Sequence, residues 1–213
     1  TKKEKNGING THVNVIVEGK DEYGHTHHIE EHEHHHNHEH EHHHEHRNLA
    51  DVNKIIDESL LAEKTKDLAK RIFLRVAKAE SKVHGKSLDE IHFHEIGAID
   101  SIVDVISFCV LLDSINPDKI YFKNITEGYG EVKCAHGTMS VPVPAVVEIV
   151  SKYRIPIKLS ENKGEMITPT GISIVASLYT EEKLPDEIII KRIGVGRGKR
   201  PYKNPTLRVF EIE

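Results

Sequence analysis

Long apolar runs and paired cysteines are both absent from this sequence. No apolar stretch approaches the roughly 20 residues that a helix needs to cross a bilayer, and no signal-type apolar segment follows the first residues. The only cysteines, Cys109 and Cys134, form no CxxC motif and are not paired by their spacing. These absences argue against a membrane protein, a disulfide framework and a zinc ribbon, and they predict a cytoplasmic protein with two buried thiols.

A basic surplus is absent too, because the formal net charge is −5 with the histidines neutral. Lysines and arginines are dispersed except in the segment 197–203. Nucleic-acid binding needs a basic face, so we do not expect it here. The chain begins with Thr1 rather than Met, and we therefore expect further residues upstream.

Hydrophobic periodicity predicts both strands and helices. Alternating apolar and polar residues predict strands over 11–18, 119–125, 130–134, 187–195 and 206–212, with a turn at 128–130. Apolar stripes and capping residues predict helices over 49–59, over a stretch that ends at Gly85, and over 100–116, 144–153 and 170–179. Because no clean βαβ repeat occurs, the pattern favours an α+β fold in which a mixed sheet packs with helices.

Composition predicts three segments along the chain. Residues 1–24 are interpreted as a partial N-terminal strand segment, 25–46 as a His/Glu-rich metal-binding tract, and 47–213 as the main α+β domain. The tract has almost no apolar side chains with which to build a core. We therefore expect it to be a disordered insertion in the absence of a ligand.

Histidine occupies every even position of the tract from 32 to 46. In an extended chain these imidazoles would share one face, and in a helix they would form two i,i+4 rows. Neutral imidazole suits Ni, Cu, Zn and Co, and the intervening glutamates add carboxylate ligands. We expect metal capture rather than catalysis, with a low-complexity insertion as the alternative. The proposed ligands are His32, His34, His36, His38, His40, His42, His44 and His46.

A second group of metal-ligand side chains follows the first long helix. Its members are His92, His94, Glu95, Asp100 and Asp104. Two histidines in an extended segment point the same way, and the two aspartates lie one helical turn apart, so all could converge on a transition metal or a metal–phosphate group. The alternatives are that Asp100 is an N-cap, that a strand histidine belongs to the core, and that Asp104 faces water.

Two further motifs place ligand-type side chains on constrained backbone. His136 lies on a turn before the rigid segment VPVP at 141–144, which suits a positioned ligand or proton carrier, although a surface histidine also fits. Thr168, Thr170 and Gly171 open a helix, where free N–H groups and hydroxyls could bind phosphate. Thr170 could equally be only an N-cap.

Alternating glycines precede basic residues in the segment 193–200. Gly194, Gly196 and Gly198 match neither a Walker loop nor a dinucleotide fingerprint. They nevertheless allow close approach of an anion. Its charge could be neutralised by Arg197, Lys199 and Arg200. The alternative is the solvated end of a basic hairpin.

The sequence resembles the LarC family, the nickel-insertion proteins that serve lactate racemase. The resemblance covers nearly the whole chain from about Asn6 onward and rests on several motifs in one order. They are the His-rich tract, AESKVHG at 79–85, IHFHEIGAIDSIVD at 91–104, CAHGTMSVPVPA at 134–145, GEMITPTG at 164–171 and IGVGRGKR at 193–200.

The resemblance implies a CTP-dependent cyclometallase, a nickel chelatase of the lyase class. Such an enzyme inserts Ni²⁺ into pyridinium-3,5-bisthiocarboxylic acid mononucleotide, and Mn²⁺ or Mg²⁺ accompanies CTP. On this hypothesis the ordered histidines and carboxylates, with His136, bind metal and carry the chemistry, while the TPTG and glycine-basic motifs hold phosphate. The alternatives are nickel storage or a metallochaperone without turnover, and a metal-dependent nucleotide hydrolase.

The family also has a further N-terminal stretch and a C-terminal domain, and in some members the coding region is divided in two. We therefore expect this chain to be a fragment or first half. Its expected partners are a separate C-terminal half and lactate racemase, and the complete protein is expected to be a homo-oligomer.

Overall fold

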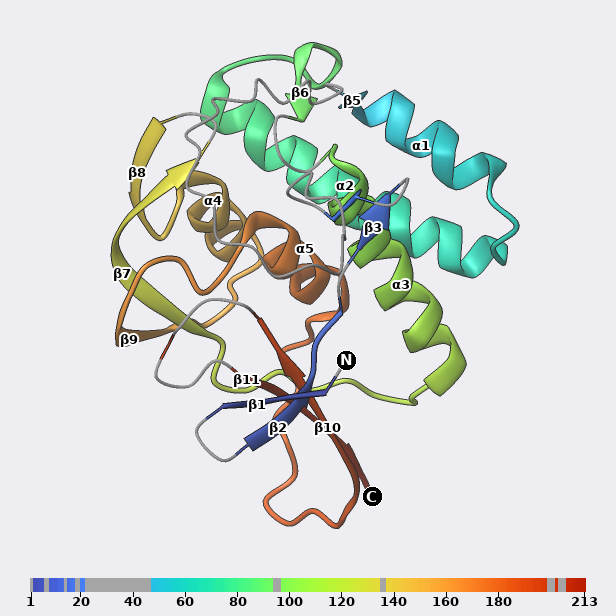
Figure 1. The fold of residues 1–213 in the computed structure, drawn as a ribbon, viewed down its shortest axis with the longest axis vertical. Coiled ribbons are helices and arrows are strands. Elements are labelled where there is room, and N and C mark those ends of the chain that lie inside the picture. The colour runs from blue at the N-terminus through green and yellow to red at the C-terminus, as the bar shows by residue number, and fades with distance from the viewer. Residues whose placement is uncertain are drawn as a thin grey trace, which may run out of the picture. The chain divides into compact units, whose positions relative to one another are not determined.

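The structure is a computed structural model, and it describes residues 2–5, 8–13, 15–17, 20–21, 47–93, 97–134, 137–198, 202 and 206–213. Figure 1 shows the arrangement of its elements. The helices are α1 (Leu49–Glu58), α2 (Glu63–His84), α3 (Ile99–Ile115), α4 (Pro144–Lys152) and α5 (Pro169–Leu178), with a short 3₁₀ turn at Leu88–Glu90. The strands are β1 (Lys2–Lys5), β2 (Ile8–Thr11), β3 (Ile16–Val17), β4 (Lys20–Asp21), β5 (Arg47–Asn48), β6 (His92–Phe93), β7 (Thr126–Cys134), β8 (Gly137–Val141), β9 (Lys158–Lys163), β10 (Ile190–Arg197) and β11 (Thr206–Ile212).

The chain divides into two compact units. The first comprises Thr1–His40 together with Lys183–Glu213, and the second comprises Glu41–Glu182. The first holds a four-stranded sheet in the order β1-β2-β10-β11, and the second holds the five helices of the described residues and a three-stranded sheet in the order β8-β7-β9. These two sheets each combine one parallel pairing with antiparallel pairing, whereas β3-β4 and β5-β6 are antiparallel two-stranded sheets, so the predicted α+β class with mixed sheets is confirmed.

Local signals fix the ends of the helices. Asn48 caps α1 through a reciprocal capping box with Asp51, and α2 ends at Gly85 in the left-handed conformation. Asn116 ends α3 in the same way, and Pro144 occupies the first turn of α4. The predicted helices over these regions are therefore confirmed to within a residue or two.

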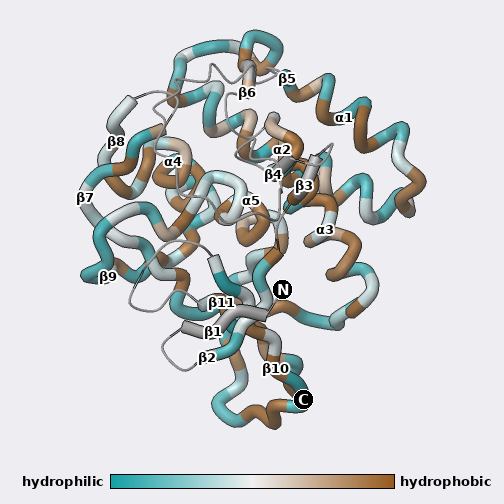
Figure 2. The backbone as a smooth tube through the Cα atoms, viewed as in Figure 1, coloured by the Kyte–Doolittle hydropathy of each residue, from teal (hydrophilic) through white to brown (hydrophobic). Residues whose placement is uncertain are grey.

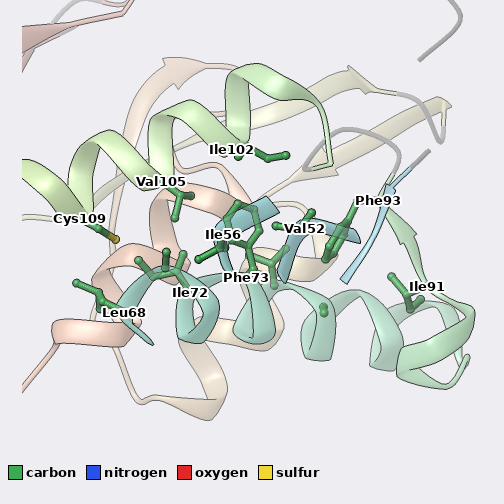
Figure 3. Close-up of a cluster of buried hydrophobic side chains, with 13 residues drawn as sticks. Val52, Ile56, Leu68, Ile72, Phe73, Ile91, Phe93, Ile102, Val105 and Cys109 are labelled. Atoms are coloured by element: carbon green, nitrogen blue, oxygen red, sulfur yellow. The ribbon is translucent and has the colours of Figure 1, made fainter. Parts of the chain in front are cut away.

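Helix α2 is the centre of the helical unit. Its apolar stripe, which includes Ile72, Phe73 and Val76, is buried in a cluster with residues of α1 and α3, and Figure 3 shows these side chains facing one another. A second cluster joins Ala79 of α2 to α4 and α5. In Figure 2 hydrophobic (brown) and hydrophilic (teal) segments alternate along these helices, as expected for helices with one buried face. Within the described residues, none of the helices combines the length and the apolar character needed to cross a membrane.

One strand prediction and one turn prediction in the helical unit are wrong. The segment 119–125 forms no strand, because its contact with β9 is limited to the carbonyl of Ile125, which accepts from Lys158 N–H at 2.7 Å, and Asn124 leaves the extended region with φ 56°. The expected turn at 128–130 lies inside β7 instead. Gly128 is needed there for close approach, because a Cβ atom at this position would lie 2.0 Å from the carbonyl oxygen of Gly164.

The four-stranded sheet joins segments that are far apart in sequence. Strands β10 and β11 form the antiparallel hairpin predicted over 187–195 and 206–212. Strand β2 pairs with β10 in parallel, with Thr11 opposite Gly196. The single strand predicted over 11–18 is wrong for its described residues, because β2 ends at Thr11, His12 and Val13 are outside any strand, and β3 begins at Ile16.

The two cysteines differ in exposure. Cys109 is buried on α3, whereas Cys134 is partly exposed where β7 meets the hairpin to β8. The prediction of two buried thiols is therefore wrong for Cys134, because it is the last residue of β7, next to the turn to β8. Burial raises the pKa of the Cys109 thiol to about 11.

This difference predicts selective alkylation. At about pH 8, iodoacetamide is expected to modify Cys134 in the folded protein and to leave Cys109 unmodified, because the thiolate is the reactive form. Mass spectrometry of the intact protein should show one adduct before denaturation and two after it. Rapid modification of Cys109 in the folded protein would contradict this packing.

Candidate functional site

Several of the proposed ligands lie outside the described residues. They are the eight histidines of the tract at even positions 32–46, with His94, Glu95, His136, Lys199 and Arg200. The remaining proposed residues lie at four places, which are β6, the start of α3, the start of α5, and the end of β10. The first three belong to the helical unit and the fourth to the sheet unit.

Asp100 and Asp104 lie one turn apart in the first half of α3. Ala98 is the N-cap of this helix and makes no side-chain capping bond, so the reading of Asp100 as the N-cap is wrong. Instead, the Asp100 carboxylate accepts a hydrogen bond from the backbone N–H of Ser101 at 2.8 Å. Asp104 is exposed. Desolvation raises the pKa of its carboxyl group, and the nearby charge of Asp100 adds to the effect.

The backbone on both sides of residues 94–96 is fixed by the fold. His92 and Phe93 form β6, which pairs with β5, and Phe93 is buried against Phe73 with ring centroids 6.5 Å apart. On the other side, the guanidinium of Arg47 donates to the carbonyl of Gly97 at 3.0 Å. Gly97 has no room for a side chain, because a Cβ atom there would lie 3.0 Å from Phe93 Cβ.

Within the described ranges, no three metal-ligating side chains gather at one point. Asp100 and Asp104 provide two carboxylates on one helix, and β6 brings the backbone of His92 into the same unit. Carboxylate oxygens are acceptable ligands for a divalent ion, and a pair of like charges becomes less costly when a cation binds between them. The convergence of the complete predicted set stays a prediction.

The start of α5 is capped by Thr168. Its hydroxyl oxygen accepts a hydrogen bond from the backbone N–H of Gly171 at 3.1 Å. The prediction that Thr170 is the cap is therefore wrong, because Pro169 occupies the first helical position and the residue before it becomes the N-cap. A phosphate at this helix start stays a prediction.

Glu127 holds the segment that precedes α5, and sequence reasoning missed it. It is completely buried on β7. Its Oε1 atom accepts hydrogen bonds from the backbone N–H groups of Gly128 at 2.7 Å, Met166 at 2.7 Å and Ile167 at 3.2 Å. Its Oε2 atom is buried and has no hydrogen-bond partner. Nothing in the sequence distinguishes this glutamate from those at the surface, because all three donors belong to the backbone and two of them come from distant residues.

The alternating glycines lie inside or just after β10. Gly194 and Gly196 are opposite Val209 and Leu207 on β11, and a Cβ atom at either glycine would meet its neighbours only at 3.9 Å or more. Arg197 ends the strand, and its Nε and Nη1 atoms are buried without a hydrogen-bond partner. The glycines therefore leave open space on one face of β10, whereas Arg197, at an alternate position of the strand, belongs to the other face.

Comparison with known proteins identifies the family. The sequence model of the family described as nickel insertion protein matches residues 1–212. The chain belongs to this nickel insertion protein family. No solved structure gives a significant match.

Relatives in this family carry a more specific name. Proteins named pyridinium-3,5-bisthiocarboxylic acid mononucleotide nickel insertion protein are 42% identical in Alkaliphilus metalliredigens, 44% in Acetivibrio thermocellus and 46% in Clostridium acetobutylicum. The matches cover 100%, 93% and 98% of this chain, but only 49%, 46% and 52% of those relatives. The chain thus spans about half the length of the nickel insertion proteins it matches.

Proposed function

We propose that this chain carries out nickel insertion into pyridinium-3,5-bisthiocarboxylic acid mononucleotide as one half of a longer system. The observation that supports this most strongly is the family match over 1–212, together with relatives of that name aligned along the whole chain. The part of the relatives' length that this chain does not match is proposed to be needed as well. The complete assembly is proposed to be a homo-oligomer.

In this proposal nickel is a substrate, and the first part of α3 is where the ion is handed over. Asp100 and Asp104 offer two carboxylates one turn apart, and we propose His92, His94, Glu95 and His136 as the other ligands. Weak oxygen ligands suit a transfer site, because they can be exchanged for the two thiocarboxylate sulfurs of the substrate. Formation of the nickel–carbon bond releases one proton from the pyridinium ring.

Phosphate groups are proposed to bind at the two remaining places. Thr168, Thr170 and Gly171 begin α5, where backbone N–H groups favour an anion. Gly194, Gly196, Arg197 and Gly198, with Lys199 and Arg200, are proposed to hold a second phosphate group, either of the mononucleotide or of CTP with its Mn²⁺ or Mg²⁺. The His-rich tract is proposed to concentrate nickel for the transfer site.

The test is a product assay with the chain and its complementing half. The two polypeptides would be incubated with Ni²⁺, CTP and the bisthiocarboxylate mononucleotide, and mass spectrometry would detect the metallated product. Product is expected with the complete chain. Deleting residues 25–46 is expected to lower the amount of nickel bound but to leave turnover at saturating nickel nearly unchanged, because the tract is not proposed to carry the chemistry.

Two outcomes separate this function from its alternatives. If nickel is bound but no product forms with the complementing half present, the chain is a storage or metallochaperone protein. If CTP is consumed rapidly without the organic acceptor, it is a nucleotide hydrolase. Loss of turnover at saturating nickel in the 25–46 deletion would place the chemistry in the tract and overturn the assignment to the ordered residues.

A further inference from the structure

The carboxyl ends of two parallel strands meet in the sheet unit. Strand β2 ends at Thr11, which lies opposite Gly196 on β10, so the next residues along the two strands, His12 and Arg197, are neighbours. His12 is buried, and its Nδ1 atom lies 3.1 Å from the carbonyl oxygen of Arg197. A carbonyl can only accept, so Nδ1 carries the proton and any other contact of the ring is made through Nε2.

Strand register places a second arginine on the same face as Arg197. Arg197 is opposite Thr206, and Val195 is opposite Arg208. Because directly opposed residues share a face and alternate residues along a strand share it as well, Arg197 and Arg208 lie on one side of the sheet. Arg192 and Glu211 oppose each other and form their ion pair on the other side.

The face that holds Arg197 and Arg208 has no carboxylate among the described residues of β2, β10 and β11. The paired positions of β10 and β11 that share it, from Ile193 and Phe210 to Arg197 and Thr206, are occupied by apolar residues, the two arginines and one threonine. Glu211 is on the opposite face, and Glu213 forms an ion pair with Lys191. Among the described residues of these strands, no carboxylate therefore compensates the charge of the two arginines on this face.

The guanidinium of Arg197 is held in place without being satisfied. Its Nε and Nη1 atoms are buried and have no hydrogen-bond partner, and no described carboxylate forms an ion pair with it. A buried donor without a partner costs about 1–3 kcal/mol, and more when it is charged. Gly10 makes this placement possible, because a Cβ atom there would lie only 3.2 Å from Arg197 Cβ. A fold that accepts this cost leaves donors for an anion.

We propose that Arg197 and Arg208 form a binding site for a phosphate monoester at the carboxyl ends of β2 and β10, with His12 positioning the backbone at Arg197 through its Nδ1–H. Guanidinium groups bind phosphate oxygens through charge-assisted hydrogen bonds, and the ends of adjacent parallel strands are a common place for such ligands. The choice of a monoester rests on the proposed function, whose mononucleotide substrate carries one. This inference adds His12 and Arg208 to the residues named in the proposed function, and it specifies the face of the sheet on which the phosphate binds.

The experiment measures binding of a simple pyridinium mononucleotide to the whole chain. Nicotinamide mononucleotide and its nucleoside, nicotinamide riboside, would be titrated by calorimetry at low salt. The mononucleotide is expected to bind at least about tenfold more tightly, because only it carries the phosphate. Arg197→Met is expected to weaken its binding by about 10–100-fold, which corresponds to one or two charge-assisted hydrogen bonds, and to leave nucleoside binding unchanged.

Two further variants control for folding and for general charge. Arg192→Met removes a positive charge from the same strand but from the opposite face, and it is expected to leave binding unchanged. Arg208→Met is an exposed change that cannot disturb the core, and it is expected to weaken mononucleotide binding severalfold even if Arg197→Met does not fold. Equal weakening by Arg192→Met and Arg197→Met would overturn the proposal, because it would indicate attraction by net charge alone.

The Tm of the protein without ligand distinguishes an Arg197 that binds phosphate from one that only stabilises the fold, because the two roles predict opposite changes of Tm in Arg197→Met. Arg197→Met is expected to keep or raise Tm, because it removes buried donors that have no partner. A lowered Tm with unchanged mononucleotide binding would overturn the site. Normal product formation by Arg197→Met would also overturn the site while the proposed function stands. Phosphate-dependent binding through Arg197 without nickel insertion would leave the site standing and remove the proposed function.

Discussion

Replacing Glu127 with alanine is expected to lower the free energy of unfolding by about 4 kcal/mol, because it leaves backbone N–H donors without their acceptor. One carboxylate oxygen accepts from Gly128, Met166 and Ile167, and the side chain is completely buried. Loss of a buried donor's partner costs about 1–3 kcal/mol each, and the cavity adds to the cost. Relief of the buried and unpartnered Oε2 atom offsets part of it.

Urea unfolding monitored by circular dichroism would measure this change. Glu127→Gln keeps the accepting oxygen and is expected to fall between wild type and alanine. Glu131→Ala provides a matched control on the same strand, because Glu131 is exposed, and it is expected to stay within about 0.5 kcal/mol of wild type. An alanine variant within about 1 kcal/mol of wild type would mean that the three hydrogen bonds contribute little.

Replacing Asp104 with asparagine is expected to stabilise the protein slightly while reducing nickel insertion by about 100-fold, the upper range for loss of a group that supports a metal site. Desolvation and the charge of Asp100 raise the pKa of Asp104. The folded state therefore binds the proton more tightly than the unfolded state, and stability falls as pH rises from the ordinary aspartate pKa to the raised value. At neutral pH the ionised group is destabilising.

The gain in the asparagine variant should therefore be pH-dependent. Because Asp104 is exposed, solvent screening limits the gain to about 1–2 °C in Tm at pH 7. It should disappear below the ordinary aspartate pKa of 3.8. Asp113→Asn, at the far end of the same helix, is the control for a change of net charge. Unchanged nickel insertion in Asp104→Asn would remove this carboxylate from the transfer site.

The helices could be predicted because their signals are local. Periodicity and the caps at Asn48, Gly85 and Asn116 lie within a few residues of the ends they fix. At α5 the local signal was present but misread, since a proline at the first helical position assigns the cap to Thr168. Asp100 and Asp104 were placed correctly on one helix for the same reason.

The sheets could not be predicted in this way, because a strand depends on a partner elsewhere in the chain. Alternation predicted a strand at 119–125 where none forms, and it missed β9, which pairs with β7 in parallel. The role of Glu127 depends on the same distant pairing. The part played by His12 also appears only when β2 is placed against β10.

The parallel pairing of β2 with β10 determines when the sheet unit can form during synthesis. His12 and Arg197 are 185 residues apart in sequence, and ribosomes add about 5–20 residues per second. The N-terminal strands must therefore wait roughly 10–40 s before their partner emerges, while the continuous stretch Glu41–Glu182 can fold during the wait. Because this long loop can close only late in synthesis, we expect the edge of β2 that pairs with β10 to be exposed and unpaired on nascent chains. The emergence of β10 and β11 from the ribosome is then the step after which the proposed phosphate site can form.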